Sequence, residues 1–407
     1  MGEKVKEGWR KVRLGEVADF KTGKLNSNAA TENGQYPFFT CSQETFRTNT
    51  YSFDTEAVIL GGNNANGIYP IKYFKGKFDA YQRTYVIRAI DDTQLCNRFL
   101  FYALTLQLNR LQSLSTGVAT KFLTLPILNN LEVSKPLYET QRKIASILSA
   151  YDDLIENNNR RIKILEEMAQ SIYREWFINF RFPGHEKVKM IDSELGKIPE
   201  GWEVKRLSDL VETQYGYTES ASEDEVGPKF LRGTDINKTS YIDWVTVPYC
   251  PINSSDYEKY RLNKEDIVVI RMADPGKVGI VEKDVEAIFA SYLIRLKLIS
   301  NSLTPYYSFY FLLSETYQGY ITGASTGTTR KSASAGVVTG INIIVPQQSL
   351  MNKFESEISA IRKQMNLLLD KNTNLRKTRD LLMPKLISRE IDVENLDIKI
   401  GHQGANA

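Results

Sequence analysis

Two loops of the sequence combine hydroxyl groups, a glycine and cations within a few residues. The first runs from Ser115, Thr116 and Gly117 to Lys121, and the second from Ser325, Thr326 and Gly327 through Thr328 to Arg330 and Lys331. Backbone amides, hydroxyls and Lys or Arg side chains all bind phosphate oxygens, so each loop is a candidate contact with a nucleic-acid backbone. Either loop taken alone also fits an ordinary surface turn before a strand. The occurrence of the pattern at two places favours the functional interpretation.

A second pair of glycine-bearing loops carries side chains that can read base edges. These are Asn63, Asn64 and Asn66 in one loop, and Arg271 and Lys277 in the other. In the major groove, Arg pairs with guanine and Asn with adenine. Each of these residues taken singly also fits a solvated turn, and that alternative stays open.

Sequence motifs for catalysis and for cofactor binding are missing. There is no GxGxxG or GxxxxGK[ST] loop, no Pro-Pro-Tyr or Pro-Pro-Phe of an amino-methyltransferase, and no Pro-Asp leading to an acidic-x-Lys nuclease triplet. The two histidines, His185 and His402, fall in an expected linker and in the tail, which disfavours a histidine base. Cys41, Cys96 and Cys250 lack CxxC spacing, which disfavours a zinc site or a disulfide framework. We therefore expect a non-catalytic chain with no metal or cofactor of its own.

The loops occur twice because the sequence contains an internal repeat. Glu7-Gly8-Trp9, Arg13-Leu14 and Gly23 recur 193 residues later as Glu200-Gly201-Trp202, Arg206-Leu207 and Gly216, whereas Ser115-Thr116-Gly117, Lys121 and Pro136 recur 210 residues later. The second copy therefore holds about 17 additional residues between its opening and its middle. A period near 200 residues is domain-sized. Two similar but non-identical domains indicate a protein that contacts two similar but non-identical targets.

Each copy contains a globular part of mixed composition. Short apolar runs rich in β-branched residues predict strands bounded by turns at 57–60, 85–88, 267–270 and 292–295. Leucines between residues 98 and 112 predict a helix. Trp9 and Trp202 are interpreted as core anchors and not as stacking platforms. Pro136 and Pro346 close these parts, so each is predicted to be a mixed α/β domain.

After each of these prolines the sequence changes to a helical pattern with a narrow apolar stripe. The first stripe consists of Ile144, Leu148, Tyr151, Ile155, Asn158, Ile162, Leu165, Ala169, Ile172 and Trp176, and the second of Phe354, Ile358, Ile361, Met365, Leu368, Asn372, Leu375, Arg379, Leu382 and Leu386. Steps of three and four are the spacing of a coiled coil, and a lone helix would leave such a stripe in water. We expect the two helices to pair antiparallel, with the domains at opposite ends of a rod about 50 Å long.

The antiparallel pairing predicts one polar layer inside the helix pair. If the first residue of one stripe faces the last residue of the other, the numbers in every facing pair add up to 530, as do those of Asn158 and Asn372. The same register brings Arg379 beside Tyr151. A buried amide pair fixes register, because a slip would leave both amides against apolar neighbours. The alternative is that each Asn bends to solvent.

Composition limits the location and the partners of the protein. The chain has 407 residues, a net charge of +3 and 25% charged residues, so an anionic partner must be held by local basic patches. Residues 1–8 are charged, and no run approaches the roughly 18 apolar residues of a membrane span. We expect a soluble, cytoplasmic protein without membrane contact.

The order of these parts resembles the specificity subunit of Type I restriction-modification systems. Ile198-Pro199-Glu200-Gly201-Trp202 resembles the family's opening of a recognition domain, and the residues 136–144, Pro-Leu-Tyr-Glu-Thr-Gln-Arg-Lys-Ile, look like the usual start of its first conserved helix. The resemblance covers essentially the whole chain and rests on the order of parts, not on a single motif.

The resemblance implies an α+β fold in which two similar globular α/β recognition domains are separated by two long helices, packed as an antiparallel coiled coil. The expected parts are a first target recognition domain at 1–136, a first conserved helix at 137–182, a linker at 183–197, a second target recognition domain at 198–346, a second conserved helix at 347–391 and a tail at 392–407. Each domain is then expected to read one half of a bipartite site in double-stranded DNA. The helices are expected to set the spacing and to dock two modification subunits.

The resemblance also places the chemistry on other chains. Methyl transfer from S-adenosylmethionine belongs to the modification subunits, and translocation and cleavage with ATP and Mg²⁺ belong to the restriction subunits. Two alternatives remain open. One is the specificity subunit of a related system that cleaves on both sides of its site. The other is a scaffold whose helices join two protein-binding domains.

Overall fold

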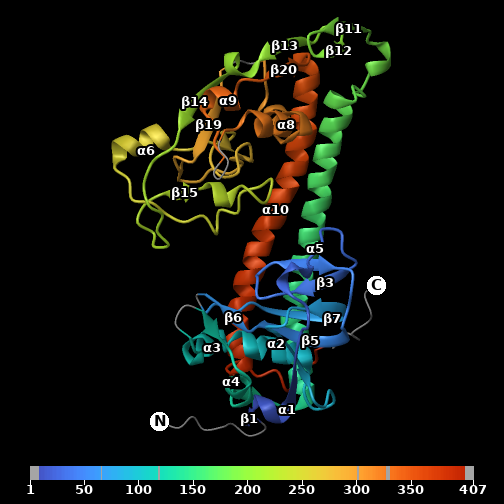
Figure 1. Cartoon of the computed structure of the whole chain (residues 1–407), viewed down its shortest axis with the longest axis vertical. Coiled ribbons are helices and arrows are strands. Elements are labelled where there is room, and N and C mark those ends of the chain that lie inside the picture. The colour runs from blue at the N-terminus through green and yellow to red at the C-terminus, as the bar shows by residue number, and fades with distance from the viewer. Residues whose placement is uncertain (1–8, 66, 118–119, 300–301, 327–330, 399–407) are drawn as a thin grey trace. The chain divides into compact units, whose positions relative to one another are not determined.

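The computed structural model describes residues 9–65, 67–117, 120–299, 302–326 and 331–398. It contains two compact units (Figure 1). The first unit consists of Met1–Glu156 and Asn374–Ala407, and the second of Asn157–Thr373. Each unit therefore holds one globular domain together with one segment of each long helix.

The first unit is built on a sheet of six strands in the order β2-β8-β5-β7-β3-β4. These strands are β2 (Ala18–Thr22), β3 (Tyr36–Phe39), β4 (Thr45–Thr48), β5 (Phe53–Gly61), β7 (Ile71–Ala80) and β8 (Thr84–Ala89). Only β3 and β7 pair in parallel among them. Successive side chains of a strand point to opposite faces. Accordingly, Val58 and Leu60 join the core under the helices, whereas Ala57 and Ile59 join an aromatic cluster on the other face.

Short elements complete this domain. They are β1 (Arg10–Arg13), which pairs with β10 (Glu132–Lys135), β6 (Asn63–Asn64), which pairs with β9 (Lys121–Phe122), and the helices α1 (Leu14–Val17), α2 (Asn97–Thr105), α3 (Leu108–Leu114) and α4 (Leu125–Asn129). The single helix predicted over 98–112 is thus two helices, α2 and α3. The chain turns at the exposed Leu106, and this turn lets both Leu104 and Leu111 reach the same core.

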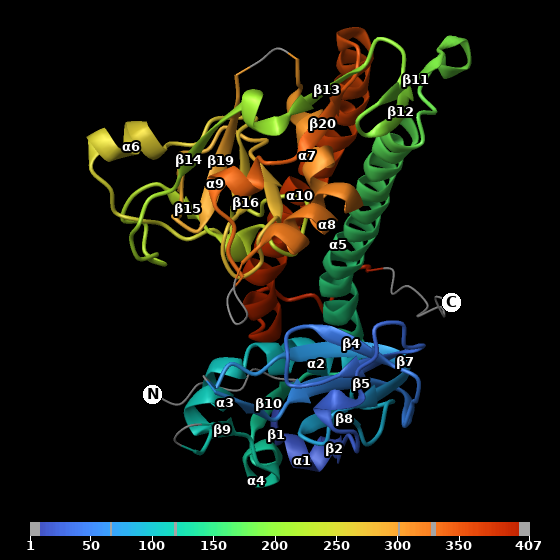
Figure 2. The ribbon, with the colours of Figure 1, turned by 45° about the horizontal axis from the view of Figure 1, so that its top comes forward.

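The second unit repeats this plan with a sheet in the order β14-β19-β16-β17. Its strands are β13 (Glu203–Arg206), which pairs with β20 (Asn342–Val345), β14 (Val211–Tyr215), β15 (Lys229–Leu231), which pairs in parallel with β18 (Ala287–Phe289), β16 (Ile267–Ile270), β17 (Val278–Ile280) and β19 (Leu293–Leu298). Its helices are α6 (Ser254–Tyr260), α7 (Pro305–Leu313), α8 (Glu315–Ala324) and α9 (Ala335–Val338). A hairpin of β11 (Met190–Ser193) and β12 (Gly196–Pro199) precedes the domain (Figure 2).

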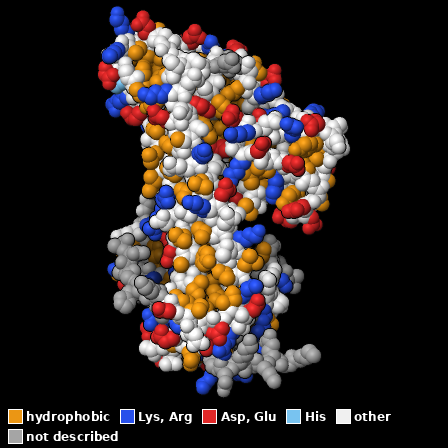
Figure 3. All heavy atoms as spheres, turned by 180° about the vertical axis from the view of Figure 1, so that it is seen from behind, with side chains coloured by type: hydrophobic (Ala, Val, Ile, Leu, Met, Phe, Trp, Pro, Cys, Tyr) orange, Lys and Arg blue, Asp and Glu red, His pale blue; other side chains and the backbone are white. Residues whose placement is uncertain are grey.

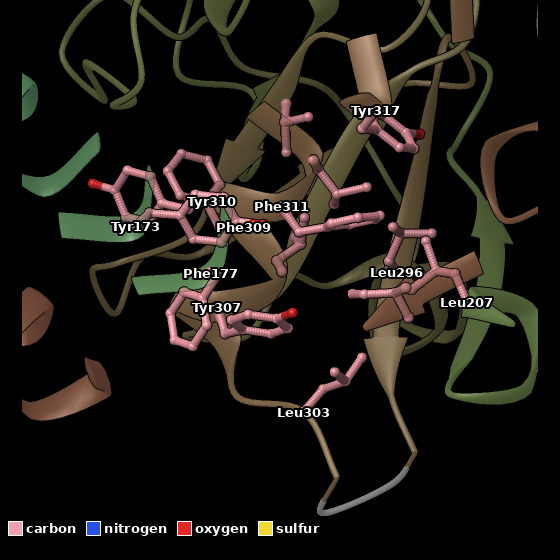
Figure 4. Close-up of a cluster of buried hydrophobic side chains, with 14 of the residues drawn as sticks. Tyr173, Phe177, Leu207, Leu296, Leu303, Tyr307, Phe309, Tyr310, Phe311 and Tyr317 are labelled. Atoms are coloured by element: carbon pink, nitrogen blue, oxygen red, sulfur yellow. The ribbon is translucent and has the colours of Figure 1, made fainter. Parts of the chain in front are cut away.

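The core of the second unit is rich in aromatic side chains. Tyr307, Phe309 and Tyr310 of α7 pack beside Tyr173 and Phe177 from the end of the first long helix (Figure 4). Trp202 is buried against the same cluster, and Trp9 is buried in the core of the first unit. Both tryptophans are therefore core anchors, as the sequence predicts.

The additional residues of the second copy lie in one stretch. Gly23 precedes a segment of 33 residues, 24–56, before the buried part of β5, whereas Gly216 precedes 50 residues, 217–266, before β16. The longer segment contains α6 and β15 where the shorter one contains β3 and β4. The two sheets therefore share their central strands and differ in this one segment.

The two stripes predicted after the prolines lie on α5 (Tyr138–Tyr173) and α10 (Gln348–Ile387), and a π-helical turn at Arg174–Ile178 follows α5. In the second unit, Asn158 contacts Asn372, Ile162 packs with Met365 and Leu368, and Trp176 lies against Phe354. In the first unit, Asp152 pairs with Arg379. In the second unit partner numbers fall as residue numbers rise, so the two helices are antiparallel there, and the pair in the first unit continues the same numbering trend. The α+β fold class and the helix pairing are confirmed.

The predicted contact between Arg379 and Tyr151 is wrong. Arg379 Nη1 instead donates to Asp152 Oδ1 at 2.5 Å, and Nη2 lies 2.8 Å from Asp380 Oδ1. A guanidinium gains more from a charged hydrogen-bond acceptor than from an aromatic ring, and the long side chain reaches the carboxylate one residue further along.

The segment after α10 packs against the globular domain of the first unit. Val393 is buried there, Glu394 Oε1 accepts a hydrogen bond of 3.3 Å from Trp9 Nε1, and the Glu394 carbonyl accepts one of 2.7 Å from Lys143 Nζ. Residues expected as a tail thus complete the first domain. Within the described ranges, no helix has the length and apolar character to cross a membrane. Figure 3 shows Lys, Arg, Asp and Glu side chains interspersed over one face, as expected for a nearly balanced net charge.

Candidate nucleic-acid interface

In the first unit, the two predicted loops are hydrogen-bonded to each other. Thr116 and Phe122 close a small hairpin through backbone hydrogen bonds of 3.1 and 2.8 Å. Gly117 has φ +108°, and a Cβ there would lie 2.1 Å from the Thr120 carbonyl oxygen, so the hairpin requires glycine. Strand β9 of this hairpin pairs with β6, which places Asn63 opposite Phe122 and Asn64 opposite Lys121. Lys121, Asn63 and Asn64 therefore belong to one surface.

The second unit forms the same arrangement 210 residues later. Thr326 and Ser332 are joined by backbone hydrogen bonds of 3.0 and 2.8 Å. The amide of Ala273 donates to the Lys331 carbonyl at 3.0 Å, and the amide of Ala333 donates to the Arg271 carbonyl at 2.8 Å. Arg271 and Lys331 thus lie in neighbouring paired segments, as the corresponding residues of the first unit do. Asn66, Thr328 and Arg330 lie outside the described residues.

In both loops the serine hydroxyl donates its hydrogen bond to a backbone carbonyl of the preceding helix. Ser115 Oγ donates to the Gln112 carbonyl at 2.6 Å, and Ser325 Oγ donates to the Ile321 carbonyl at 2.5 Å. Each hydroxyl has one hydrogen to donate, so in this conformation neither serine offers it to a phosphate. Thr116, by contrast, is exposed, as is Lys331, and Lys121 is half-buried with its aliphatic stem beside Gly67.

Arg271 is held by its own domain. Its guanidinium lies 4.8 Å from the centre of the Tyr215 ring, and Nη1 donates to the Ser291 carbonyl at 3.4 Å. The Tyr215 hydroxyl in turn accepts a hydrogen bond of 2.9 Å from the amide of Ala335. Lys277 is exposed on the far side of a tight turn, where its carbonyl accepts from the amide of Ile270 at 2.8 Å. Arg271 and Lys277 therefore flank one turn, with Arg271 the more constrained of the two.

A third segment that the sequence analysis missed lies beside these loops in both units. The carbonyl of Arg83 accepts from the amide of Gly62 at 2.8 Å, and the carbonyl of Tyr292 accepts from the amide of Arg271 at 2.9 Å. The exposed Arg83 guanidinium lies 5.5 Å from the centre of the Phe122 ring. Tyr292 is 54% exposed. Isolated turn residues give no periodic signal, so only their equivalent spacing from the repeat could have indicated them.

An uncharged tyrosine hydroxyl in the first unit and a hollow in the second unit lie beside the interface. Tyr85 donates from its hydroxyl to the Leu123 carbonyl at 2.9 Å, and burial raises the pKa of Tyr85, which keeps that donor protonated. In the second unit, a hollow beside the hairpin is lined by Arg232, Asn237, Met272, Ala273 and Tyr292, among others. In the parts of the chain that the structure describes, no group of three or more His, Cys, Asp and Glu residues is placed to hold a metal ion.

Comparison with known proteins identifies relatives along the whole chain. The family model described as the Type I restriction modification DNA specificity domain matches residues 6–167 and again residues 199–366. The Type I restriction enzyme MjaVIII specificity subunit of Methanocaldococcus jannaschii is 26% identical over 411 residues, with 97% of this chain and 96% of that protein covered. The MjaIX specificity subunit of the same organism is 30% identical over 303 residues, which cover 70% of this chain and 66% of that protein.

A solved structure shares the fold. The crystal structure of a Type I restriction-modification system S subunit from M. genitalium matches with a TM-score of 0.57 and 16% identity, over 95% of this chain and 98% of that chain. At that identity the likeness bears on the fold alone.

Proposed function

The chain belongs to the family of Type I restriction-modification specificity subunits, and from this membership we propose how its parts work. Its two specificity domains indicate a bipartite DNA target, with one half-site for each domain. The surface that reads DNA is, in the first domain, the one formed by residues 62–64, 81–84, 115–117 and 120–122. In the second domain it is formed by residues 271–274, 290–293, 325–326 and 331–333. These two sets are called the reading surfaces below.

One observation carries this proposal. In each domain the same three segments, far apart in the sequence, are held together by equivalent backbone hydrogen bonds. A hairpin with a cation next to exposed turn side chains offers both kinds of contact that sequence-specific binding needs. The cation and backbone amides suit phosphates, which position the protein, and the turn side chains suit base edges, which specify the sequence.

The chain works as a non-catalytic subunit. Support comes from the sequence, which lacks motifs for S-adenosylmethionine, for a nucleoside triphosphate and for a nuclease centre. Methyl transfer then takes place on modification subunits, and ATP and Mg²⁺ act on restriction subunits. Two alternatives differ from this proposal in measurable ways. One is a scaffold without DNA binding, and the other is a related system that cleaves on both sides of its site.

The long helices provide the docking surface for two modification subunits, one on each helix, and set the half-site spacing. Support comes from large apolar side chains that the helices leave exposed. On α5 these are Leu154, Ile164 and Met168, and on α10 they are Leu367 and Leu381. Leu154 and Met168 are two heptads apart, as are Leu367 and Leu381, so each pair shares one face of its helix. Exposed apolar faces of this kind mark sites of protein association.

Reconstitution tests the proposal. The purified chain, the modification subunit from the same genome and the two together are each given genomic DNA and S-adenosylmethionine, and single-molecule sequencing maps the methylated bases. We expect one bipartite motif from the mixture and no methylation from the chain alone. Methyl transfer by the isolated chain contradicts the non-catalytic role. A mixture that binds DNA without a steep loss of affinity between low and physiological salt contradicts phosphate contact and favours the scaffold.

A further inference from the structure

The two reading surfaces can be compared position by position because their backbones are bonded alike. The pairing of Asn64 with Lys121 corresponds to that of Ala273 with Lys331, and the bond from Gly62 to Arg83 corresponds to that from Arg271 to Tyr292. Three side chains of the described residues are the same in both surfaces, namely the serine at 115 and 325, the threonine at 116 and 326 and the lysine at 121 and 331. The side chains at the other equivalent positions differ: Asn63 and Met272, Asn64 and Ala273, Arg83 and Tyr292, and Phe122 and Ser332.

This pattern separates two roles. Two different half-sites have the same sugar-phosphate chemistry but different bases. A residue kept in both surfaces therefore suits contact with phosphate, whereas residues that differ suit contact with bases. Among the residues that differ, Arg83 and Tyr292 occupy the same turn position, and both have exposed side chains. Resting on the function proposed above, we propose that Arg83 and Tyr292 are equivalent base-reading residues, one for each half-site, and that Arg83 reads a guanine.

The surroundings of Arg83 suit the recognition of guanine. Its backbone carbonyl accepts two hydrogen bonds, one from the Gly62 amide at 2.8 Å and one from Cys41 Sγ at 3.3 Å, so the turn is fixed. The Phe122 ring, 5.5 Å from the guanidinium, restricts the side chain while leaving its donors exposed. A planar guanidinium held in this way presents two parallel donors, which match the O6 and N7 acceptors of guanine in the major groove.

Tyr292 offers different chemistry at the same turn. It has no paired donors, and its exposed ring stands at the rim of the hollow lined by Met272, Ala273 and Asn237. An aromatic ring beside apolar side chains suits the 5-methyl group of thymine, which is the apolar feature of the major groove. The second half-site should therefore contain a thymine at the position that Tyr292 reads, whereas the first should contain a guanine at the position that Arg83 reads.

The test uses the complex of the chain with its modification subunit on a DNA library randomised within both half-sites. The variants are Arg83→Gln and Tyr292→Ala, with Arg88→Gln, an exposed arginine on the adjoining strand β8, as the matched control. We expect Arg83→Gln to lower the preference for guanine at one position of one half-site by about tenfold or more, and to leave the other half-site unchanged. Tyr292→Ala should relax one position of the opposite half-site. Arg88→Gln should leave the motif as it is.

Several outcomes overturn this inference while the proposed function stands. They are an unchanged motif in the Arg83→Gln and Tyr292→Ala complexes, a uniform loss of methylation at an unchanged motif, and a wild-type motif in which neither strand of the affected half-site contains guanine. Thermal unfolding of each variant shows whether the domain is folded. Arg83→Lys, which keeps the charge but loses the paired donors, is a second test of the same position. If the wild-type complex methylates no bipartite motif, the proposed function fails first.

Discussion

Asn158 and Asn372, 214 residues apart in the sequence, share a hydrogen bond of 2.8 Å from Nδ2 of Asn158 to Oδ1 of Asn372 between the two long helices. Asn372 donates its own Nδ2 to Oδ1 of Asn159, also at 2.8 Å. Asn372 is fully buried and Asn158 nearly so, and the neighbouring layer contains Ile162 and Leu368. The contact that the register predicts is thereby confirmed. Its role in fixing that register remains a prediction.

Replacing one asparagine of this amide pair should lower the free energy of unfolding more than replacing both. Asn158→Leu leaves the buried Asn372 without its donor, and we expect a loss of about 1–3 kcal/mol in the free energy of unfolding. The double change of both residues to Leu should recover most of that loss, because two apolar side chains suit the neighbouring layers. Chemical denaturation of the three proteins measures this. Equal losses in the single and double variants would show that the pair is not energetically coupled.

Glu355 predicts a pH-dependent contribution to stability. Its carboxylate accepts from the amide of Tyr306 at 3.1 and 3.3 Å, but burial is the larger effect and raises the pKa of Glu355 above its usual range. A carboxyl whose pKa is higher in the folded state stabilises that state when protonated. This contribution is present below the unfolded pKa, about 4.3, and is lost as the pH rises through the folded pKa.

Glu355→Gln, which keeps the neutral form at all pH values, should therefore raise the melting temperature at pH 7, and the gain should shrink towards pH 4. The exposed Glu357→Gln on the same helix is the control and should show little change. A variant that is less stable than the wild type at pH 7 would show that the hydrogen bonds to the carboxylate outweigh its burial.

Lys121 and Lys331 are predicted to contact phosphates. Replacement of either by Ala should weaken DNA binding across all sequences, lower the slope of log affinity against log salt by about 1, and leave the methylated motif unchanged. The control is Lys264→Ala, an exposed lysine outside the reading surfaces. Binding titrations at four salt concentrations give the slope. A new motif in either variant would make that lysine a base reader.

The helices are predicted to set the spacing between half-sites. One heptad inserted after Glu156 and one after Thr373 keeps the facing pairs in register, because residues 157 and 373 face each other in the antiparallel numbering. The insertion lengthens the helix pair by about 10 Å, which corresponds to roughly three base pairs. In a variant that is still active, the methylated motif should keep both halves and widen only its unspecified centre. An unchanged spacer would mean that the helices dock subunits and that another part sets the distance.

Sequence reasoning succeeded where a pattern extends over many residues. The repeat offset located the hairpins of Lys121 and Lys331, and the stripe spacing located the contact between Asn158 and Asn372, since both depend on regular backbone geometry. It failed where a single long side chain chooses between neighbours, as when Arg379 pairs with Asp152 instead of Tyr151.

Sequence reasoning also failed where distant segments meet without a local signal. The bond from Trp9 to Glu394 spans 385 residues and depends on how the chain returns to the first domain after α10. The turns of Arg83 and Tyr292 reach the reading surfaces through backbone hydrogen bonds, which leave no mark on the choice of side chain.

Each domain is proposed to read its own half of a split DNA site. Residues 8–136 are replaced by the corresponding region of a relative with a different known motif, and the chimera is combined with the modification subunit. Single-molecule sequencing then reads the methylated motif. Independent reading by the two domains predicts that one half of the motif changes to that of the relative while the other half and its spacing stay the same. A motif in which both halves change, or neither does, contradicts it.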